Sequence, residues 1–284
     1  LDLDARYGCE AVGVNVSEST VLLADGAEVP YGGLIVATGV RPRRLPGTPA
    51  HVLRTLDDAL TLKDRLGPGR TLAVVGAGFL GAETASVAAG LGTHVTLLEP
   101  AAVPLAHAVG EDVGRVLAQV HLDHGVDLRA GTGVSEVVPG GVRLDDGSVV
   151  EADTVLVAVG SQPNTEWLAG SGLQLNPGLE CDATLTAVGD PDVLGAGDIV
   201  SWPHPLADGD AIRIEHWTVA AEHGRLAGRN VLLAPEERAP YDQPPYFWSD
   251  QYDVKIQSLG MPGRAGRLEL LESTADGSRL VYGG

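Results

Sequence analysis

The stretch from Val74 to Glu83, VVGAGFLGAE, places three glycines in the spacing GxGxxG between a β-rich run and an alanine-rich run. A strand, a glycine turn and a helix in this order predict a dinucleotide-binding βαβ unit. Gly76 permits the tight turn, Gly78 lets the backbone approach a pyrophosphate, and Gly81 lets the helix pack on the strand. The helix N-terminus attracts the negative charge, so the stretch predicts a phosphate site.

A second β-like run, HVTLL at 94–98, ends at Glu99. This is about twenty residues beyond the loop, where a carboxylate can bind the ribose hydroxyls of NAD and repel a 2′-phosphate. The segment EPAAVPLAH at 99–107 contains no lysine or arginine. These residues therefore favour NADH over NADPH.

An internal repeat extends the prediction to the rest of the chain. Residues 21–39 and 142–160 align without a gap, and each contains a strand, an Asp-Gly turn, a second strand and an apolar strand that ends in glycine. We interpret them as two copies of one nucleotide-binding unit. The glycine loop precedes the last glycine of the second copy by about 84 positions. The same spacing in the first copy falls upstream of Leu1, so we expect the first copy's own loop to lie outside this chain.

Composition narrows the class of protein. The 284 residues suffice for two compact domains, and the formal net charge of −19 argues against binding to nucleic acid or anionic lipid. Cys9 and Cys181 form no CxxC pair, so we expect neither a disulfide framework nor a dithiol centre. The histidines have no repeated ligand spacing, so we assign no metal site. With no apolar run of membrane-spanning length and no signal peptide, we expect a cytoplasmic protein.

Five further segments carry a family resemblance: LIVATGVRPRRLPG at 34–47, VLVAVGSQPN at 155–164, VLGAGDIV at 193–200, RIEHWTVAAEHGRLAGRNV at 213–231 and PYFWSDQYDVKIQSLG at 245–260. With these segments the chain resembles the FAD-dependent NADH:ferredoxin reductases of bacterial monooxygenase and dioxygenase systems, the putidaredoxin-reductase and biphenyl-dioxygenase-reductase type. These belong to the pyridine nucleotide-disulfide oxidoreductase superfamily. The motifs EHW and PYFWSDQY separate this group from the disulfide reductases, whose redox CxxxxC this sequence lacks.

The resemblance implies an α/β fold with two Rossmann-like domains, in which an FAD domain is interrupted by an inserted NAD domain. The FAD domain is expected at 1–45 and 164–237, the NAD(H) domain at 46–163, and the start of an α+β C-terminal interface domain at 238–284. Relative to the family we expect both ends of the chain to be cut, and we expect this chain alone to bind FAD weakly or not at all.

The implied activity is electron transfer from NADH through FAD to a [2Fe-2S] ferredoxin that serves a monooxygenase or dioxygenase. The protein would act as a monomer or weak homodimer. Because ferredoxins are usually acidic, Arg264 and Arg267 are candidates for a basic docking patch.

The resemblance also assigns site residues. Glu83 is expected near the nicotinamide, Trp217 by the isoalloxazine, and Trp248 on the ferredoxin side, where it would assist electron passage. The residues implied in cofactor binding are Thr38, Gly39, Arg41, Gly76, Gly78, Phe79, Leu80, Gly81, Glu99, Gly160, Gly197, Asp198, Glu215, His216 and Trp217.

Simpler roles stay open at this stage. Arg41 is also consistent with an ordinary surface arginine, and Glu83 with an acidic residue that stabilises a helix N-terminus. Trp217 and Trp248 are each also consistent with simple packing. At the level of function, the alternatives are an NADH-dependent flavoprotein with another acceptor, such as a nitrite reductase flavin subunit or an NADH oxidase, and an NAD-binding redox module of the apoptosis-inducing-factor kind.

Overall fold

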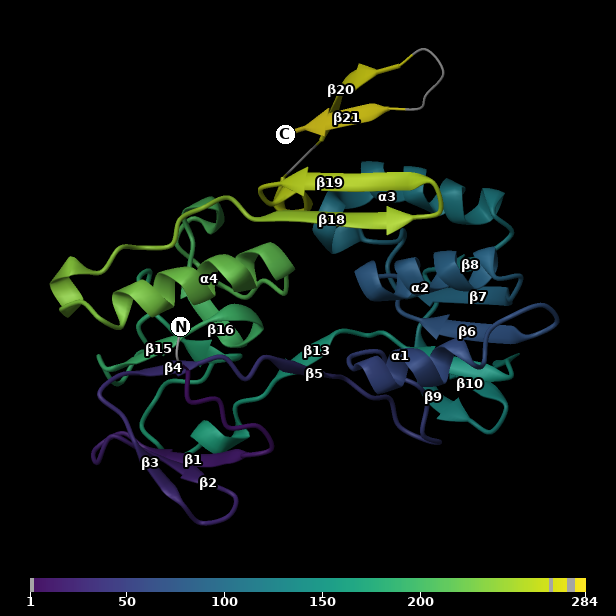
Figure 1. Cartoon of the computed structure of the whole chain (residues 1–284). Coiled ribbons are helices and arrows are strands. Elements are labelled where there is room, and N and C mark those ends of the chain that lie inside the picture. The colour runs from purple at the N-terminus through teal and green to yellow at the C-terminus, as the bar shows by residue number, and fades with distance from the viewer. Residues whose placement is uncertain (1–2, 266–267, 275–278) are drawn as a thin grey trace. The chain divides into compact units, whose positions relative to one another are not determined.

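A computed structural model describes residues 3–265, 268–274 and 279–284 (Figure 1). The chain forms two compact units. Unit 1 comprises Leu1–Arg41 and Gln162–Pro245, and unit 2 comprises Pro42–Ser161 and Tyr246–Gly284. The four domain segments expected from the sequence stay a prediction; in the structure, the segment from Tyr246 onward packs with unit 2.

Unit 2 is built on a four-stranded parallel sheet in the order β12-β6-β7-β8. Its strands are β6 (Thr71–Val75), β7 (His94–Glu99), β8 (Asp127–Ala130) and β12 (Thr154–Val157), and its helices are α1 (Leu56–Lys63), α2 (Phe79–Gly90) and α3 (Ala106–Asp123). A three-stranded antiparallel sheet, β11-β10-β9, adds β9 (Val134–Val138), β10 (Gly141–Leu144) and β11 (Val149–Glu151).

The two faces of the parallel sheet bury different cores, because side chains alternate along a strand. In β6, Ala73 and Val75 pack in one cluster with Val142 of the antiparallel sheet. Leu72 and Val74 belong to a second cluster that includes residues of α2. Both faces are thus covered, which explains why β6 is an uninterrupted apolar run.

Unit 1 contains smaller sheets and one long helix, α4 (Trp217–Asn230). β1 (Ala11–Asn15), β2 (Thr20–Leu23) and β3 (Glu28–Pro30) form an antiparallel sheet, β4 (Leu34–Val36) pairs in parallel with β15 (Val193–Gly195), and β14 (Leu179–Glu180), β16 (Val200–Pro203) and β17 (Ala211–Ile212) form a third sheet. β5 (Val40–Pro42) pairs with β13 (Ser161–Pro163) where the chain passes between the units. The 3₁₀ turns are η1 (Glu166–Leu168), η2 (Gly197–Ile199), η3 (Pro205–Ala207), η4 (Pro235–Glu237) and, in unit 2, η5 (Pro262–Arg264).

The predicted strands and turns of the repeat are present in both copies. At each turn the aspartate accepts a hydrogen bond from the backbone two residues on, at 2.9 Å for Asp25 and 2.9 Å for Asp146. The glycine that follows has a φ of 86° in both copies. The closing glycines Gly39 and Gly160 also share a positive φ, at 62° and 89°. The aligned residues therefore adopt the same local conformation in each unit.

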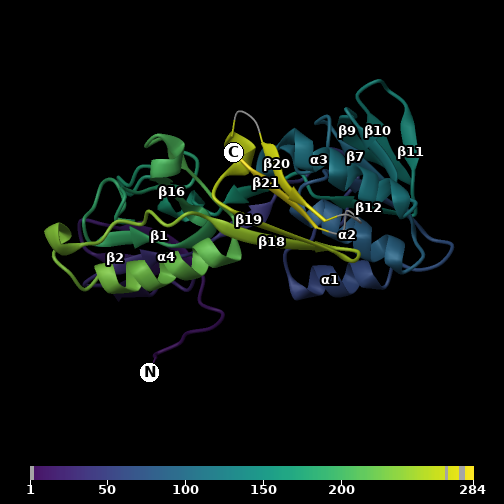
Figure 2. The same ribbon diagram turned by 90° about the horizontal axis from the view of Figure 1, so that it is seen from above.

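Two hairpins follow the second segment of unit 1. They comprise β18 (Tyr246–Gln251) with β19 (Val254–Leu259), and β20 (Glu269–Ser273) with β21 (Leu280–Gly283). Figure 2 shows the first hairpin running alongside α2. Phe247, Ser249 and Gln251 are buried, whereas the alternate residues of β18 are more exposed. Among the helices of the described residues, none is long and apolar enough to cross a membrane.

Candidate functional site

The glycine loop connects β6 to α2 as predicted, and its three glycines meet different surroundings. Gly76 has a φ of 97°, and a Cβ there would lie 2.5 Å from the Ala158 carbonyl oxygen. A Cβ at Gly81 would collide with the Gly76 carbonyl oxygen. A Cβ at Gly78 would meet no atom within 4 Å. Glycine is thus required for packing at 76 and 81, while at 78 it leaves the space beside the loop open.

The N-terminus of α2 has the features of an anion-binding site. Gly78 is the N-cap residue, so no side chain caps the helix, and the first turn contains no acidic residue. The first amide groups of a helix carry a partial positive charge and need acceptors. An open loop and an uncapped helix N-terminus fit the pyrophosphate of a dinucleotide.

Glu99 lies at the end of β7 and binds the loop directly. Its Oε2 accepts a hydrogen bond from the Ala77 amide at 2.6 Å, and its Oε1 accepts one from the Ala101 amide at 2.8 Å. A carboxylate offers about four acceptor positions, so acceptor capacity remains for the ribose hydroxyls. The same carboxylate holds the loop and gives this site a negative charge.

Glu83 lies one turn beyond the loop and contacts the strand that carries Trp248. The Ser249 hydroxyl donates a hydrogen bond to Glu83 Oε1 at 2.6 Å. Phe79, the first residue of α2, packs its ring 4.7 Å from that of Phe247. Trp248, the residue between Phe247 and Ser249 in β18, points to the other face of the strand and is 41% exposed. The structure therefore brings together Phe79, Glu83 and the PYFWSDQY strand; Leu80 is partly exposed on the same helix.

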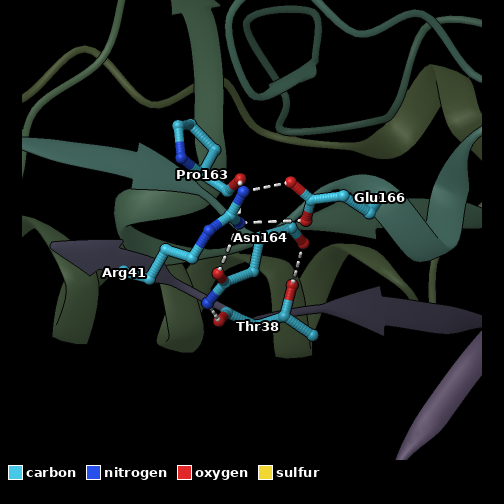
Figure 3. A network of polar contacts seen from close by, with 5 residues as sticks. All are labelled: Thr38, Arg41, Pro163, Asn164 and Glu166. Carbon is cyan, nitrogen blue, oxygen red and sulfur yellow. Dashed lines mark hydrogen bonds and ion pairs between the residues drawn. The ribbon is translucent and has the colours of Figure 1, made fainter. Parts of the chain in front are cut away.

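In unit 1 a polar network surrounds Arg41 (Figure 3). The Arg41 guanidinium donates to the Pro163 carbonyl at 3.3 Å and to Asn164 Oδ1 at 3.1 Å, and it pairs with Glu166. Asn164 also donates to the Thr38 carbonyl at 2.8 Å, and its backbone amide donates to the Gly39 carbonyl at 3.0 Å. The hydrogen bond from Arg41, more than its charge, lowers the pKa of the Glu166 carboxyl. Arg41 thus joins the two chain segments of unit 1 and is not an isolated surface arginine.

A second group in unit 1 gathers at the start of α4. Arg213, which the sequence did not indicate as a site residue, donates to the Asp198 carbonyl at 3.0 Å and pairs with Glu215 at 2.6 Å. Gly197 has a φ of 74°. The contacts of Arg213 fix the Glu215 carboxylate beside the η2 turn.

His216 and Trp217 lie at the N-terminus of α4. His216 is the N-cap residue, and burial lowers the pKa of its imidazole, partly offset by the charge of Glu215. Trp217 is the first helical residue and is 78% exposed, so it does not serve simple core packing.

The remaining expected residues fall as follows. Gly160 belongs to unit 2, where its carbonyl accepts from the Arg43 amide at 3.0 Å. Arg264 lies in η5, and Arg267 lies outside the described residues. Within the described ranges no cluster of three His, Cys, Asp or Glu side chains could hold a metal ion.

An open glycine loop, an uncapped helix and an acidic strand end define a dinucleotide-binding class of protein. The model of the pyridine nucleotide-disulphide oxidoreductase family matches residues 2–224, and the chain belongs to this family.

Among the relatives is the ferredoxin–NAD(+) reductase component of the p-cumate 2,3-dioxygenase system of Pseudomonas putida, 35% identical over 98% of this chain and 66% of that protein. The corresponding component of the anthranilate 1,2-dioxygenase system of Burkholderia cepacia is 34% identical over 98% of this chain and 70% of that protein. The solved covalent complex of putidaredoxin reductase with putidaredoxin matches with a TM-score of 0.85 and 29% identity, over 97% of this chain and 69% of that one. The chain spans about two thirds of the length of the relatives it matches.

Proposed function

We propose that this protein is an NADH-dependent flavoprotein that passes electrons to a [2Fe-2S] ferredoxin of a monooxygenase or dioxygenase system. The observation that carries the proposal is the loop at the start of α2, open at Gly78 and held by Glu99. The family and the ferredoxin–NAD(+) reductase names of the relatives support the choice of reaction.

NADH binding falls to unit 2. The amides at the N-terminus of α2 would hold the pyrophosphate, and Gly78 leaves room for it. Glu99 would accept from the ribose hydroxyls and would repel a 2′-phosphate, which favours NADH over NADPH. Glu83 and Phe79 would lie toward the nicotinamide end.

FAD binding falls mainly to unit 1. Thr38, Gly39 and Arg41 would approach the cofactor from one group of unit 1, and Gly197, Asp198, Glu215, His216 and Trp217 from the other. Gly160, in unit 2, stays a candidate for cofactor binding with no particular cofactor assigned to it. Two observations support the fit of the unit 1 residues to FAD: the positive φ of Gly197, and the Glu215 carboxylate that Arg213 holds beside the η2 turn. A carboxylate held in place can accept hydrogen bonds from sugar hydroxyls. The chemistry that the flavin supplies is acceptance of a hydride and release of single electrons.

The partner is a ferredoxin. Ferredoxins are usually acidic and this chain is acidic as well, so docking needs a local basic residue, for which Arg264 is a candidate. The exposed Trp248 would lie on the ferredoxin side and assist electron passage. We further propose a cytoplasmic monomer or weak homodimer.

The test is an anaerobic titration, with NADH and then NADPH, of the purified protein extended upstream through the glycine loop expected for the first copy of the repeat, because the chain from Leu1 alone is expected to bind FAD weakly or not at all. We expect NADH to bleach the flavin band near roughly 450 nm and NADPH to do so poorly. The reduced protein should then reduce a [2Fe-2S] ferredoxin at a rate at least as fast as steady-state turnover with NADH.

Four results would overturn parts of this proposal. An extended protein without a flavin band would contradict the flavoprotein assignment. Equal bleaching by NADPH would contradict the role of Glu99. Flavin reduction without ferredoxin reduction would indicate another acceptor, as in an NADH oxidase or nitrite reductase subunit, and slow reduction with a long-lived charge-transfer complex would indicate a module of the apoptosis-inducing-factor kind.

A further inference from the structure

The inward face of β18, together with Tyr252 in the turn that follows it, contacts one face of α2 at three successive levels. The helix residues are spaced i, i+4 and i+7, so they share that face. The contacts are the Phe247 ring on the Phe79 ring at 4.7 Å, the Ser249 hydroxyl on Glu83 at 2.6 Å, and the Tyr252 amide on Ser86 Oγ at 2.6 Å. A strand far away in sequence thus covers the segment that begins at the dinucleotide loop.

The middle contact has a defined direction. Ser249 is 0% exposed, so water does not compete for its hydroxyl. The Gln251 side-chain amide donates to the Ser249 oxygen at 3.2 Å. Because a hydroxyl has one hydrogen, the Ser249 hydrogen is committed to Glu83 Oε1. The carboxylate is therefore held by a hydroxyl that is itself held from behind.

The Gln251 side chain that donates to Ser249 lies in a buried environment. Gln251 and His121 are both fully buried, and Tyr252 O–H lies 3.0 Å from His121 Nδ1. Burial lowers the pKa of His121, the charge of His124 lowers it further, and the Gln251 side chain partly offsets both. Gln251, the donor to the Ser249 oxygen, therefore keeps this hydrogen bond away from water.

We propose that Ser249 is a positioning residue that fixes the Glu83 carboxylate toward the nicotinamide end of bound NADH. The inference rests on the proposed function, in which Glu83 faces the nicotinamide. Ser249 itself touches neither substrate nor cofactor, and its effect passes through the single hydrogen bond to Glu83 Oε1.

The test uses the flavin-loaded protein, extended upstream as in the preceding test, and four variants of it: Ser249→Ala, Ser86→Ala, Glu83→Gln and the double variant of Ser249→Ala with Glu83→Gln. Ser86→Ala is the matched control, because it removes a hydrogen bond between the same strand end and the same helix without touching Glu83. Stopped-flow reduction by NADH gives the limiting rate, calorimetry gives the dissociation constant of NAD+, and urea unfolding gives stability.

We expect Ser249→Ala to lower the limiting rate about tenfold, since hydrogen bonds to charged groups are the strong ones. The dissociation constant of NAD+ should stay within about threefold, because the loop and its helix N-terminus are untouched. Ser86→Ala should leave the rate unchanged even where it lowers stability. Adding Ser249→Ala to Glu83→Gln should cause no further loss, because the two residues act as one unit.

The proposal is overturned if Ser249→Ala reduces its flavin at the wild-type rate while Glu83→Gln is slow. It is also overturned if Ser86→Ala slows the rate as much, which would assign the effect to docking of the hairpin. Should Ser249→Ala fail to fold, Ser249→Cys keeps the size with a weaker donor, and a wild-type rate there would count against the role. Wild-type protein whose flavin NADH does not reduce would instead refute the proposed function.

Discussion

Lowering the pH from 7 to 5 should destabilise unit 1 through one buried histidine. His223 on α4 is 0% exposed, with its ring edge-on to Trp202 at 4.6 Å and to Tyr241 at 4.5 Å. Neither ring nitrogen has a hydrogen-bond partner within the part of unit 1 that the structure describes. Burial, with a smaller contribution from His204, lowers the pKa of His223 from 6.5 to about 4.

The sign and size of the effect follow from this depressed pKa. Below pH 6.5 His223 is mostly protonated in the unfolded chain, whereas in the folded chain it stays neutral until the pH approaches 4. Stability is therefore intact at neutral pH and is lost as the pH falls from about 6.5 to about 4. At pH 5 the loss from this group amounts to about 2 kcal/mol.

The assay is urea unfolding at pH 7 and pH 5, followed by tryptophan fluorescence because Trp202 is buried beside His223. The comparison is with His223→Gln, which does not titrate. Burial also lowers the pKa of His121 and His216, but both are present in both proteins and cancel in the difference. The wild type should lose about 2 kcal/mol more than His223→Gln between the two pH values.

Equal losses in the two proteins would refute this reasoning. An NMR titration of the wild type offers an independent check that needs no variant. A pKa of His223 near its ordinary value in the folded protein would show that burial does not exclude the proton.

Three further predictions concern other parts of the chain. Gly78→Ala should weaken NAD+ binding at least about tenfold without lowering the urea midpoint, because its methyl group enters the space left for the pyrophosphate. Gly81→Ala should lower the urea midpoint, because its methyl group meets the backbone. Calorimetry and urea unfolding measure both variants, and the same change in binding and stability for the two would contradict the distinction. At pH 8 a thiol reagent should label the exposed Cys9 rapidly and Cys181 only after denaturation, because burial raises the pKa of Cys181 to about 12; rapid labelling of both in the native protein would contradict this. Asn230→Ala should cost about 3 kcal/mol in urea unfolding, since the buried amide donates to two carbonyls and accepts from one backbone amide, and a loss below about 1 kcal/mol would show that water replaces these bonds.

The elements around the glycine loop were predictable because their determinants are local. Glycine spacing and apolar runs predicted β6, the turn and α2 in their observed order. The in-register repeat likewise predicted the strands and Asp-Gly turns of both copies, since a two-residue turn fixes the pairing of its flanking strands.

The contacts that tie distant segments together were not predictable from the sequence. Ser249 and Glu83 are 166 residues apart, and only the docking of β18 on α2 brings them within 2.6 Å. Arg213 and Asn164 stood in motifs that were noticed, yet their partners depend on how the two segments of unit 1 pack. The exposure of Trp217 depends equally on tertiary context, because sequence alone marks tryptophan as a core residue as readily as a surface one.

The paired strands β5 and β13 have a consequence for engineering. Arg41 and Gln162 mark where the chain leaves and re-enters unit 1, and the bonds between Thr38 and Asn164 hold these two exit points together. Residues 42–161 thus form a cassette, and a foreign domain with closely spaced ends could be grafted there without changing the register of unit 1. Such a graft would remove α2, the helix whose face the 246–251 segment covers. A functional exchange must therefore transplant the cassette and this distant strand as a matched pair.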